Sequence, residues 1–229
     1  MTSENHLVDV DKILRVLGNT SDWNNPAGYR SSLALCVMDS IWSIGIRYQT
    51  VEMVLNRYLK ARGYAGLKES QSCLDGPRAL LEWVEALSMP GGTPAEVFSG
   101  AVQNKNRTSS VNGILKAEAV LQACFLLKSM GIDSPKDLLA QSDVVEPLWC
   151  SEVKGQASGI SWRYLLMLSG QSGVKPDRWI ISFMQRMGVG AGMSPKDFVQ
   201  TIVAGIGQED IDATAVDHRI WSLERKKGG

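Results

Sequence analysis

The chain is poor in the residues that metal and redox sites use. Its 229 residues include two histidines, His6 and His218, and four cysteines, which lie far apart and form no Cys-x-x-Cys pair. A structural zinc site needs four closely spaced ligands of these types, so the sequence argues against one. With so few histidines, the sequence also gives little support for a nucleophile that a histidine activates. We expect free, mostly buried thiols, as in a reducing cytoplasm.

The sequence also lacks an excess of charge and a long apolar run. Lys and Arg number 24, as do Asp and Glu, so the formal net charge is zero. A chain with no net charge does not attract nucleic acid through its overall charge. Binding through a local basic patch is still compatible with this composition. No segment is as long and apolar as a membrane span, and the N-terminus has no signal-peptide core. With 44% hydrophobic and 21% charged residues, we expect a folded cytoplasmic protein.

Signals for β-structure and for nucleotide binding are scarce, whereas helix signals recur. There is no P-loop, no Rossmann phrase and no pair of alternating apolar runs joined by a tight turn. Thr93-Pro94, Ser134-Pro135 and Ser194-Pro195 each combine a capping hydroxyl, a proline at the first helical position and an acid two residues later. Segments such as 29–44 and 111–130 have helical apolar spacing. The sequence predicts an all-α fold of about ten helices.

The most distinctive segment runs from Lys154 to Phe183. It begins with KGQASGI, in which the glycines allow a tight turn with uncovered backbone N–H groups. At the start of the next helix such groups bind anions, and Lys154 and Arg163 can add positive charge. A turn with glycine and proline then leads to Asp177 at the head of another helix. Taken alone, the glycines also fit an ordinary joint between helices, and Asp177 an ordinary N-cap.

Taken together, these features resemble the helix-hairpin-helix DNA glycosylase superfamily, which includes endonuclease III and the alkyladenine glycosylases. Members carry a glycine-rich hairpin, a helix, a Gly/Pro turn and an essential aspartate that begins a helix. The present chain has VKGQASGI, SWRYLLML, SGQSGVKP and Asp177 in that order. The resemblance extends from Tyr29 to Trp221, through the barrel-like segment 29–59 and Leu115-Lys116-Ala117-Glu118. Its specific part lies between Lys154 and Phe183.

The resemblance implies a two-lobed helical protein with a helix-hairpin-helix motif. One lobe would comprise approximately residues 1–28 and 135–229, and the other would be a helical barrel at 29–134. The first lobe would hold the hairpin at 154–160, the Asp-bearing helix from 177 and a C-terminal helix at 210–224.

The implied activity is hydrolysis of the N-glycosidic bond of a damaged or mispaired base that has left the DNA stack. Asp177 would be catalytic, because a carboxylate can stabilise the oxocarbenium-like sugar and orient or deprotonate water. Candidates for filling the gap in the stack or for lining the base pocket are Arg47, Tyr48, Gln49 and Trp162. The implied DNA-binding residues are Lys154, Gly155, Gln156, Ser158, Gly159, Ile160, Arg163 and Lys175.

Three departures from the family pattern narrow these expectations. The hairpin lacks the usual Pro-Gly pair, and no lysine occupies Ser161 to Arg163, where members with lyase activity carry one. No cysteine follows Cys150, so the four-cysteine iron–sulfur site is missing. The chain is expected to be a monofunctional monomer that acts on duplex DNA without a cofactor or metal. A monovalent cation at the hairpin backbone is compatible with the resemblance.

Three alternatives stay open at this point. Asp217, in the phrase Val216-Asp217-His218-Arg219-Ile220, also fits the family's aspartate phrase, although the preceding Gly205-Ile206-Gly207 leaves no room for a full helix before it. We favour Asp177. A non-catalytic DNA-binding protein that retains the fold is the second interpretation, and an all-α protein–protein interaction module is the third.

Overall fold

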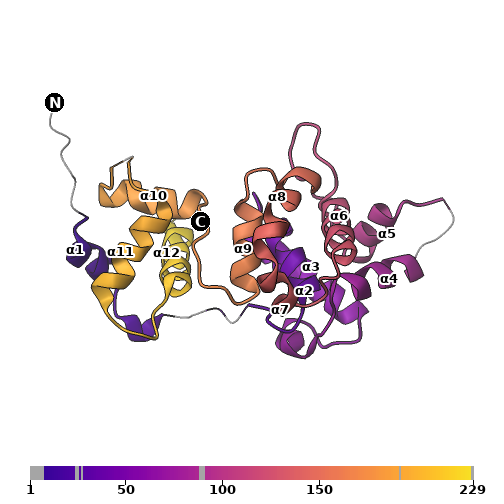
Figure 1. The fold of residues 1–229 in the computed structure, drawn as a ribbon, viewed down its shortest axis with the longest axis horizontal. Helices are drawn as coiled ribbons and strands as arrows, with labels where there is room; N and C mark the ends of the chain where they lie inside the picture. The colour runs from indigo at the N-terminus through magenta and orange to yellow at the C-terminus, as the bar shows by residue number, and fades with distance from the viewer. Residues whose placement is uncertain (1–7, 24–25, 27, 88–90, 191, 228–229) are drawn as a thin grey trace. The chain divides into compact units, whose positions relative to one another are not determined.

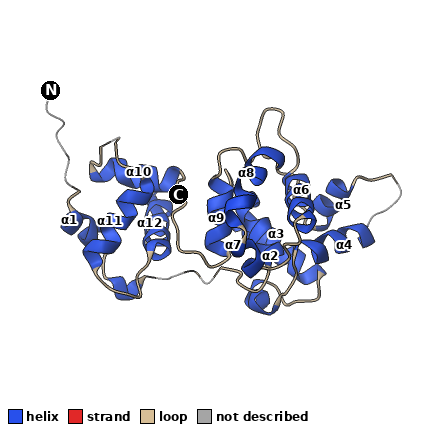
Figure 2. Cartoon of the chain, in the orientation of Figure 1, coloured by secondary structure: helices blue, strands red, loops and turns tan. Residues whose placement is uncertain are grey.

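The computed structural model describes residues 8–23, 26, 28–87, 91–190 and 192–227. Within these ranges the chain forms twelve α-helices and two short 3-10 helices, η1 and η2, and no β-strand (Figures 1 and 2). An isolated antiparallel bridge joins Arg107 to Leu115. The all-α prediction is therefore confirmed. None of the helices described has the length and apolar character that a membrane crossing requires.

The helices group into two compact units, Met1–Pro26 with Ser172–Gly229, and Ala27–Gln171. The smaller unit has its own apolar core, to which Leu17, Phe183, Phe198 and Ile220 contribute. Each of its helices therefore buries one face against its neighbours. The elements of this unit are α1 (Val10–Leu17), η1 (Thr20–Asp22), α10 (Arg178–Met187), α11 (Pro195–Ile206) and α12 (Ala213–Lys227).

The larger unit is built around α2 (Leu33–Trp42), all of whose residues are buried. A helix that is apolar on every face can be stable in water only when other helices surround it. Those that pack against α2 include α3, α4, α6 and α9. The other elements of this unit are α3 (Tyr48–Ala61), η2 (Leu67–Ser72), α4 (Pro77–Leu87), α5 (Pro94–Ala101), α6 (Lys116–Ser129), α7 (Pro135–Ala140), α8 (Ser142–Glu152) and α9 (Ile160–Leu168).

This division assigns residues 135–171 to a different unit from the lobe in which we expected them. These residues, which include the hairpin, belong to the larger unit with the predicted barrel. The reason is packing, because Leu138, Trp149 and Leu165 lie in the same apolar core as the residues of α2. Apolar packing of α9 on α2, of α8 on α6 and of α7 on α8 thus decides the unit to which these three helices belong.

The helix starts follow the predicted local signals. Thr93 and Ser134 each form a capping box with the acid three residues later, and Ser194 caps α11 with its side chain. The helix expected from residue 111 instead begins at Lys116. Residues 104–115 form an ordered loop before it, which Figure 1 shows rising from the start of α6.

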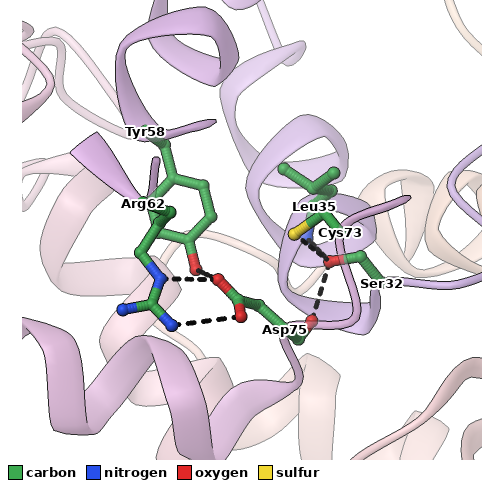
Figure 3. Close-up of polar contacts among 6 residues, drawn as sticks. All are labelled: Ser32, Leu35, Tyr58, Arg62, Cys73 and Asp75. Carbon is green, nitrogen blue, oxygen red and sulfur yellow. Dashed lines mark hydrogen bonds and ion pairs between the residues drawn. The ribbon is translucent and has the colours of Figure 1, made fainter. Parts of the chain in front are cut away.

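A buried polar network fastens the segment before α4 to α2 and α3 (Figure 3). The Asp75 carboxylate accepts hydrogen bonds from the Tyr58 hydroxyl at 2.7 Å and from Arg62 Nε at 2.7 Å. Its backbone carbonyl accepts from the Ser32 hydroxyl, and the Cys73 thiol donates to Ser32 Oγ. Burial acts to raise the pKa of Asp75, but the bonds from Arg62 and Tyr58 outweigh it and hold that pKa below its usual value.

Lys116 closes the C-terminal end of α2. The side chain is 2% exposed, and Nζ donates to the carbonyl oxygens of Ile41, Trp42 and Ile44 at 3.1, 2.9 and 2.5 Å. The last carbonyls of a helix have no partner within the helix and carry partial negative charge. A buried ammonium group at this place therefore satisfies them, and it fixes the loop that follows α2.

Candidate functional site

The hairpin predicted at 154–160 is a tight joint between α8 and α9. Gly155 has φ +85° and Gly159 has φ +69°, the left-handed region that favours glycine. The Gln156 N–H donates to the Val153 carbonyl, and the Gly159 N–H donates to the Gln156 carbonyl. Gly159 is the N-cap of α9 and has no side chain with which to cap it. The Ile160 N–H donates to Ser158 Oγ at 3.5 Å. Gly159, Ser161 and Trp162 are buried, so little of the backbone in this first turn is open to an anion.

The hairpin residues differ in their exposure. Lys154, Ser158 and Arg163 are exposed and can reach a ligand, and Ile160 is partly exposed. Gln156 is 3% exposed, so its side chain is part of the interior and the expected DNA contact through it is not available.

The expected base-stacking role of Trp162 is also corrected by burial. Its side chain is 1% exposed, and its ring packs against that of Trp149 with a centroid separation of 5.6 Å. The reason is its place on the inner face of α9, in the core of the larger unit. Trp162 therefore stabilises the joint between α8 and α9 from the inside.

The three candidates that follow α2 lie at the start of α3. Arg47 is the N-cap of α3, and both Arg47 and Gln49 are exposed. Tyr48 is partly buried, and its hydroxyl donates to Oδ2 of the buried Asp39, which also accepts from Tyr29. Burial, followed by the nearby Asp39 charge, raises the pKa of Tyr48. Arg47 and Gln49 are thus free to contact a ligand, whereas the Tyr48 ring is held by the protein.

Asp177 begins α10, as the sequence predicts. Its Oδ1 accepts the Trp179 N–H at 2.8 Å, which makes it the N-cap, and its Oδ2 lies 3.9 Å from Lys175 Nζ. The side chain keeps 22% of its surface exposed. One oxygen is therefore used for folding, while the other faces a cation near the surface.

The turn before Asp177 is fixed from α12. The Gly173 N–H donates to Thr214 Oγ1 at 3.0 Å, and the Lys175 N–H donates to Asp217 Oδ1 at 3.1 Å. Asp177 itself donates its N–H to the Lys175 carbonyl at 2.7 Å. Residues that lie some forty positions further along the chain thus set the position of the Asp177 carboxylate.

The two aspartates that the sequence offers as rivals are neighbours in one cluster. Burial, followed by the negative charge of Asp177, raises the pKa of Asp217 to about 8. The protonated form of Asp217 is thus favoured over its usual range, and Asp177 lies near enough to contribute to this shift while its own Oδ2 is 3.9 Å from Lys175 Nζ.

The sequence reasoning missed a contact between the hairpin and the loop 104–115. A Cβ atom on Gly155 would lie 2.6 Å from Thr108 Cβ, so the Thr108 side chain packs directly on the Gly155 backbone. The Lys154 N–H donates to Gln122 Oε1 of α6 at 3.0 Å. The available signal was Asn112-Gly113, a turn dipeptide. Asn112 has φ +55°, and the bridge between Arg107 and Leu115 closes the loop.

The candidate residues belong to different units. Lys154 to Arg163 and Arg47 to Gln49 are in the unit 27–171, and Lys175, Asp177 and Asp217 are in the other. Across the ranges that the structure covers, no group of three or more His, Cys, Asp or Glu side chains is arranged to hold a metal ion.

A family model described as "Domain of unknown function (DUF8548)" matches residues 8–225. No curated protein and no solved structure matches the chain.

Proposed function

The chain belongs to the DUF8548 family, and we propose that this member hydrolyses the bond between a base and its sugar in DNA, as a monofunctional N-glycosylase. The observation that carries the proposal is the geometry of Asp177. Its carboxylate stands at a helix start in a turn fixed by α12, with the side chain partly exposed and one oxygen not needed for the cap. The order of hairpin, helix, turn and aspartate in the sequence supports the same reaction.

Asp177 would act on the sugar as the bond to the base breaks. The sugar gains positive charge in this step, and a fixed carboxylate stabilises that charge without reorganisation. The same group can orient the attacking water or accept its proton. Lys175 would release Oδ2 or share it, because a separation of 3.9 Å is at the long limit of an ion pair.

The larger unit would hold the DNA backbone. The exposed side chains of Lys154 and Arg163, near the start of α9, suit a phosphate. Arg47 and Gln49, both exposed, would fill the space left by the displaced base.

A DNA-binding protein without catalysis is the second candidate, and one observation favours it. Both oxygens of Asp177 have protein partners, the Trp179 N–H and Lys175 Nζ. If the ion pair persists when DNA binds, Asp177 serves only to organise the turn.

The substitution Asp177→Asn separates the two candidates. Asparagine retains the oxygen that caps α10 but loses the charge, so folding and DNA binding should persist. Single-turnover release of bases from duplexes that each carry one damaged or mispaired base would be measured. We expect the rate on the preferred duplex to fall by about a hundredfold or more. Asp197→Asn, in the exposed first turn of α11, is the matched control and should retain the wild-type rate.

Two results would contradict the proposal. One is base release by Asp177→Asn at the wild-type rate. The other is a wild-type protein that binds the duplexes yet releases no base from any of them, which would support the non-catalytic candidate.

A further inference from the structure

The loop 104–115, which precedes α6 in Figure 1, is held by hydrogen bonds within it and lies against the hairpin at Gly155. The Thr108 N–H donates to the Ile114 carbonyl at 2.9 Å, and the Lys116 N–H donates to the Asn106 carbonyl at 2.8 Å. Arg107 Nη1 donates to the Gly113 carbonyl at 2.7 Å across the loop. A loop that is already ordered loses little entropy when it binds a partner.

The base of this loop is anchored in the larger unit. Asn104 Oδ1 accepts from the indole N–H of the buried Trp42 at 2.9 Å and from the Asn106 N–H at 3.1 Å. At the hairpin side, Thr108 packs on Gly155 so closely that only glycine fits. The loop and the hairpin are therefore two parts of one surface within the same unit.

Both parts of this surface are free of acidic residues in the sequence. No Asp or Glu occurs between Glu96 and Glu118, or between Glu152 and Asp177. The exposed cations in these two segments are Lys105, Arg107, Lys154 and Arg163. In a chain with zero net charge, such a local excess favours a polyanion as the partner.

The tip of the loop is apolar and unusually exposed. The Val111 side chain is 73% exposed, and its backbone is fixed by Ser109, whose Oγ donates to the Val111 carbonyl and accepts the Val111 N–H. An apolar side chain held outward among polar neighbours suits contact with sugars or base edges, as in proteins that insert apolar side chains into a duplex.

We propose that the loop 104–115 is a second DNA-binding arm beside the hairpin. Lys105 and Arg107 contact phosphates, and Val111 contacts the duplex at the tip. This inference rests on the proposed function for the identity of the ligand, but it concerns binding only. It can be tested in the Asp177→Asn protein, in which the reaction is removed, so that a failure of catalysis and a failure of the loop give different results.

The test is binding of a fluorescein-labelled DNA duplex, followed by anisotropy over a series of salt concentrations. In the Asp177→Asn background, Lys105→Glu should weaken binding about tenfold and lower the slope of log affinity against log salt by about one. Val111→Asp should also weaken binding about tenfold, because it places a negative charge against the phosphates. Matched controls in the same unit are Lys136→Glu and Val144→Asp, both at exposed positions in first helical turns, which should bind as the parent does.

The inference is overturned if the two loop variants bind the duplex as tightly as their controls, with unchanged salt slopes and unchanged far-UV circular dichroism. It is also overturned if the parent protein does not bind the duplex but binds polyglutamate, since the basic surface would then be a binding site for an acidic protein.

Discussion

Asp217→Asn should stabilise the protein, and the gain should grow as the pH rises. In the native state the pKa of this carboxyl is raised from 3.8 to about 8 by burial and by the charge of Asp177. Between these two values the native chain holds a proton that the unfolded chain has released. The free energy of unfolding therefore falls as the pH rises through this window. Below the pKa of the unfolded chain, Asp217 is protonated in both states and does not change the free energy of unfolding.

The magnitude follows from the size of the shift. Each unit of difference in pKa changes the free energy of unfolding by about 1.4 kcal/mol. Over the whole window the loss amounts to an upper limit of about 5 kcal/mol near pH 8. Asparagine has no proton to lose, and its side-chain oxygen can still accept the Lys175 N–H. The wild type and the variant should thus be alike near pH 4 and should diverge steadily above it.

The assay is urea unfolding at several pH values, followed by tryptophan fluorescence, because Trp23, Trp179 and Trp221 lie in the same unit as Asp217. Asp210→Asn, at an exposed position just before α12, is the control and should show the pH dependence of the wild type. A constant difference between Asp217→Asn and wild type at about pH 5 and about pH 7.5 would refute the reasoning, since only a titrating group changes with pH in this way.

The other predictions concern the larger unit. Lys116→Met should lower the free energy of unfolding by about 3 kcal/mol, because the carbonyls of Ile41, Trp42 and Ile44 lose a buried charged donor; equal denaturant midpoints would contradict this. Gly155→Ala should destabilise the protein more than Gly131→Ala does. Both positions have positive φ and share a penalty of about 1 kcal/mol, but only at Gly155 would the new Cβ meet Thr108. Thermal unfolding measures the difference, and DNA binding should weaken only in the Gly155 variant.

Much of the candidate site was readable from local sequence. The glycines at 155 and 159 adopt the left-handed conformation, and Asp177 caps α10, because turns and caps depend on residues within a few positions of each other. The side chains were less predictable. Trp162 turns inward because α9 packs on α2, and no local pattern in so apolar a helix marks which side faces the core. Gln156 is buried in the joint before α9, where no sequence pattern marked it as an interior residue.

Sequence reasoning also treated Asp177 and Asp217 as competing choices, whereas the fold brings both into one cluster with Lys175. Their separation along the chain gives no hint of this, since the contact depends on how α10 and α12 pack. The loop 104–115 was mistaken in part for the start of α6, although Asn112-Gly113 marks a turn.

The sequence by itself determined the all-α class, most helix starts and the glycine joint, because these depend on short-range hydrogen bonding and on the apolar spacing within each helix. Only the tertiary structure decided which carboxyl group has a raised pKa, which loop lies against Gly155 and which tryptophan is inside. These properties come from burial and from charges on distant segments, and both exist only once the helices have packed.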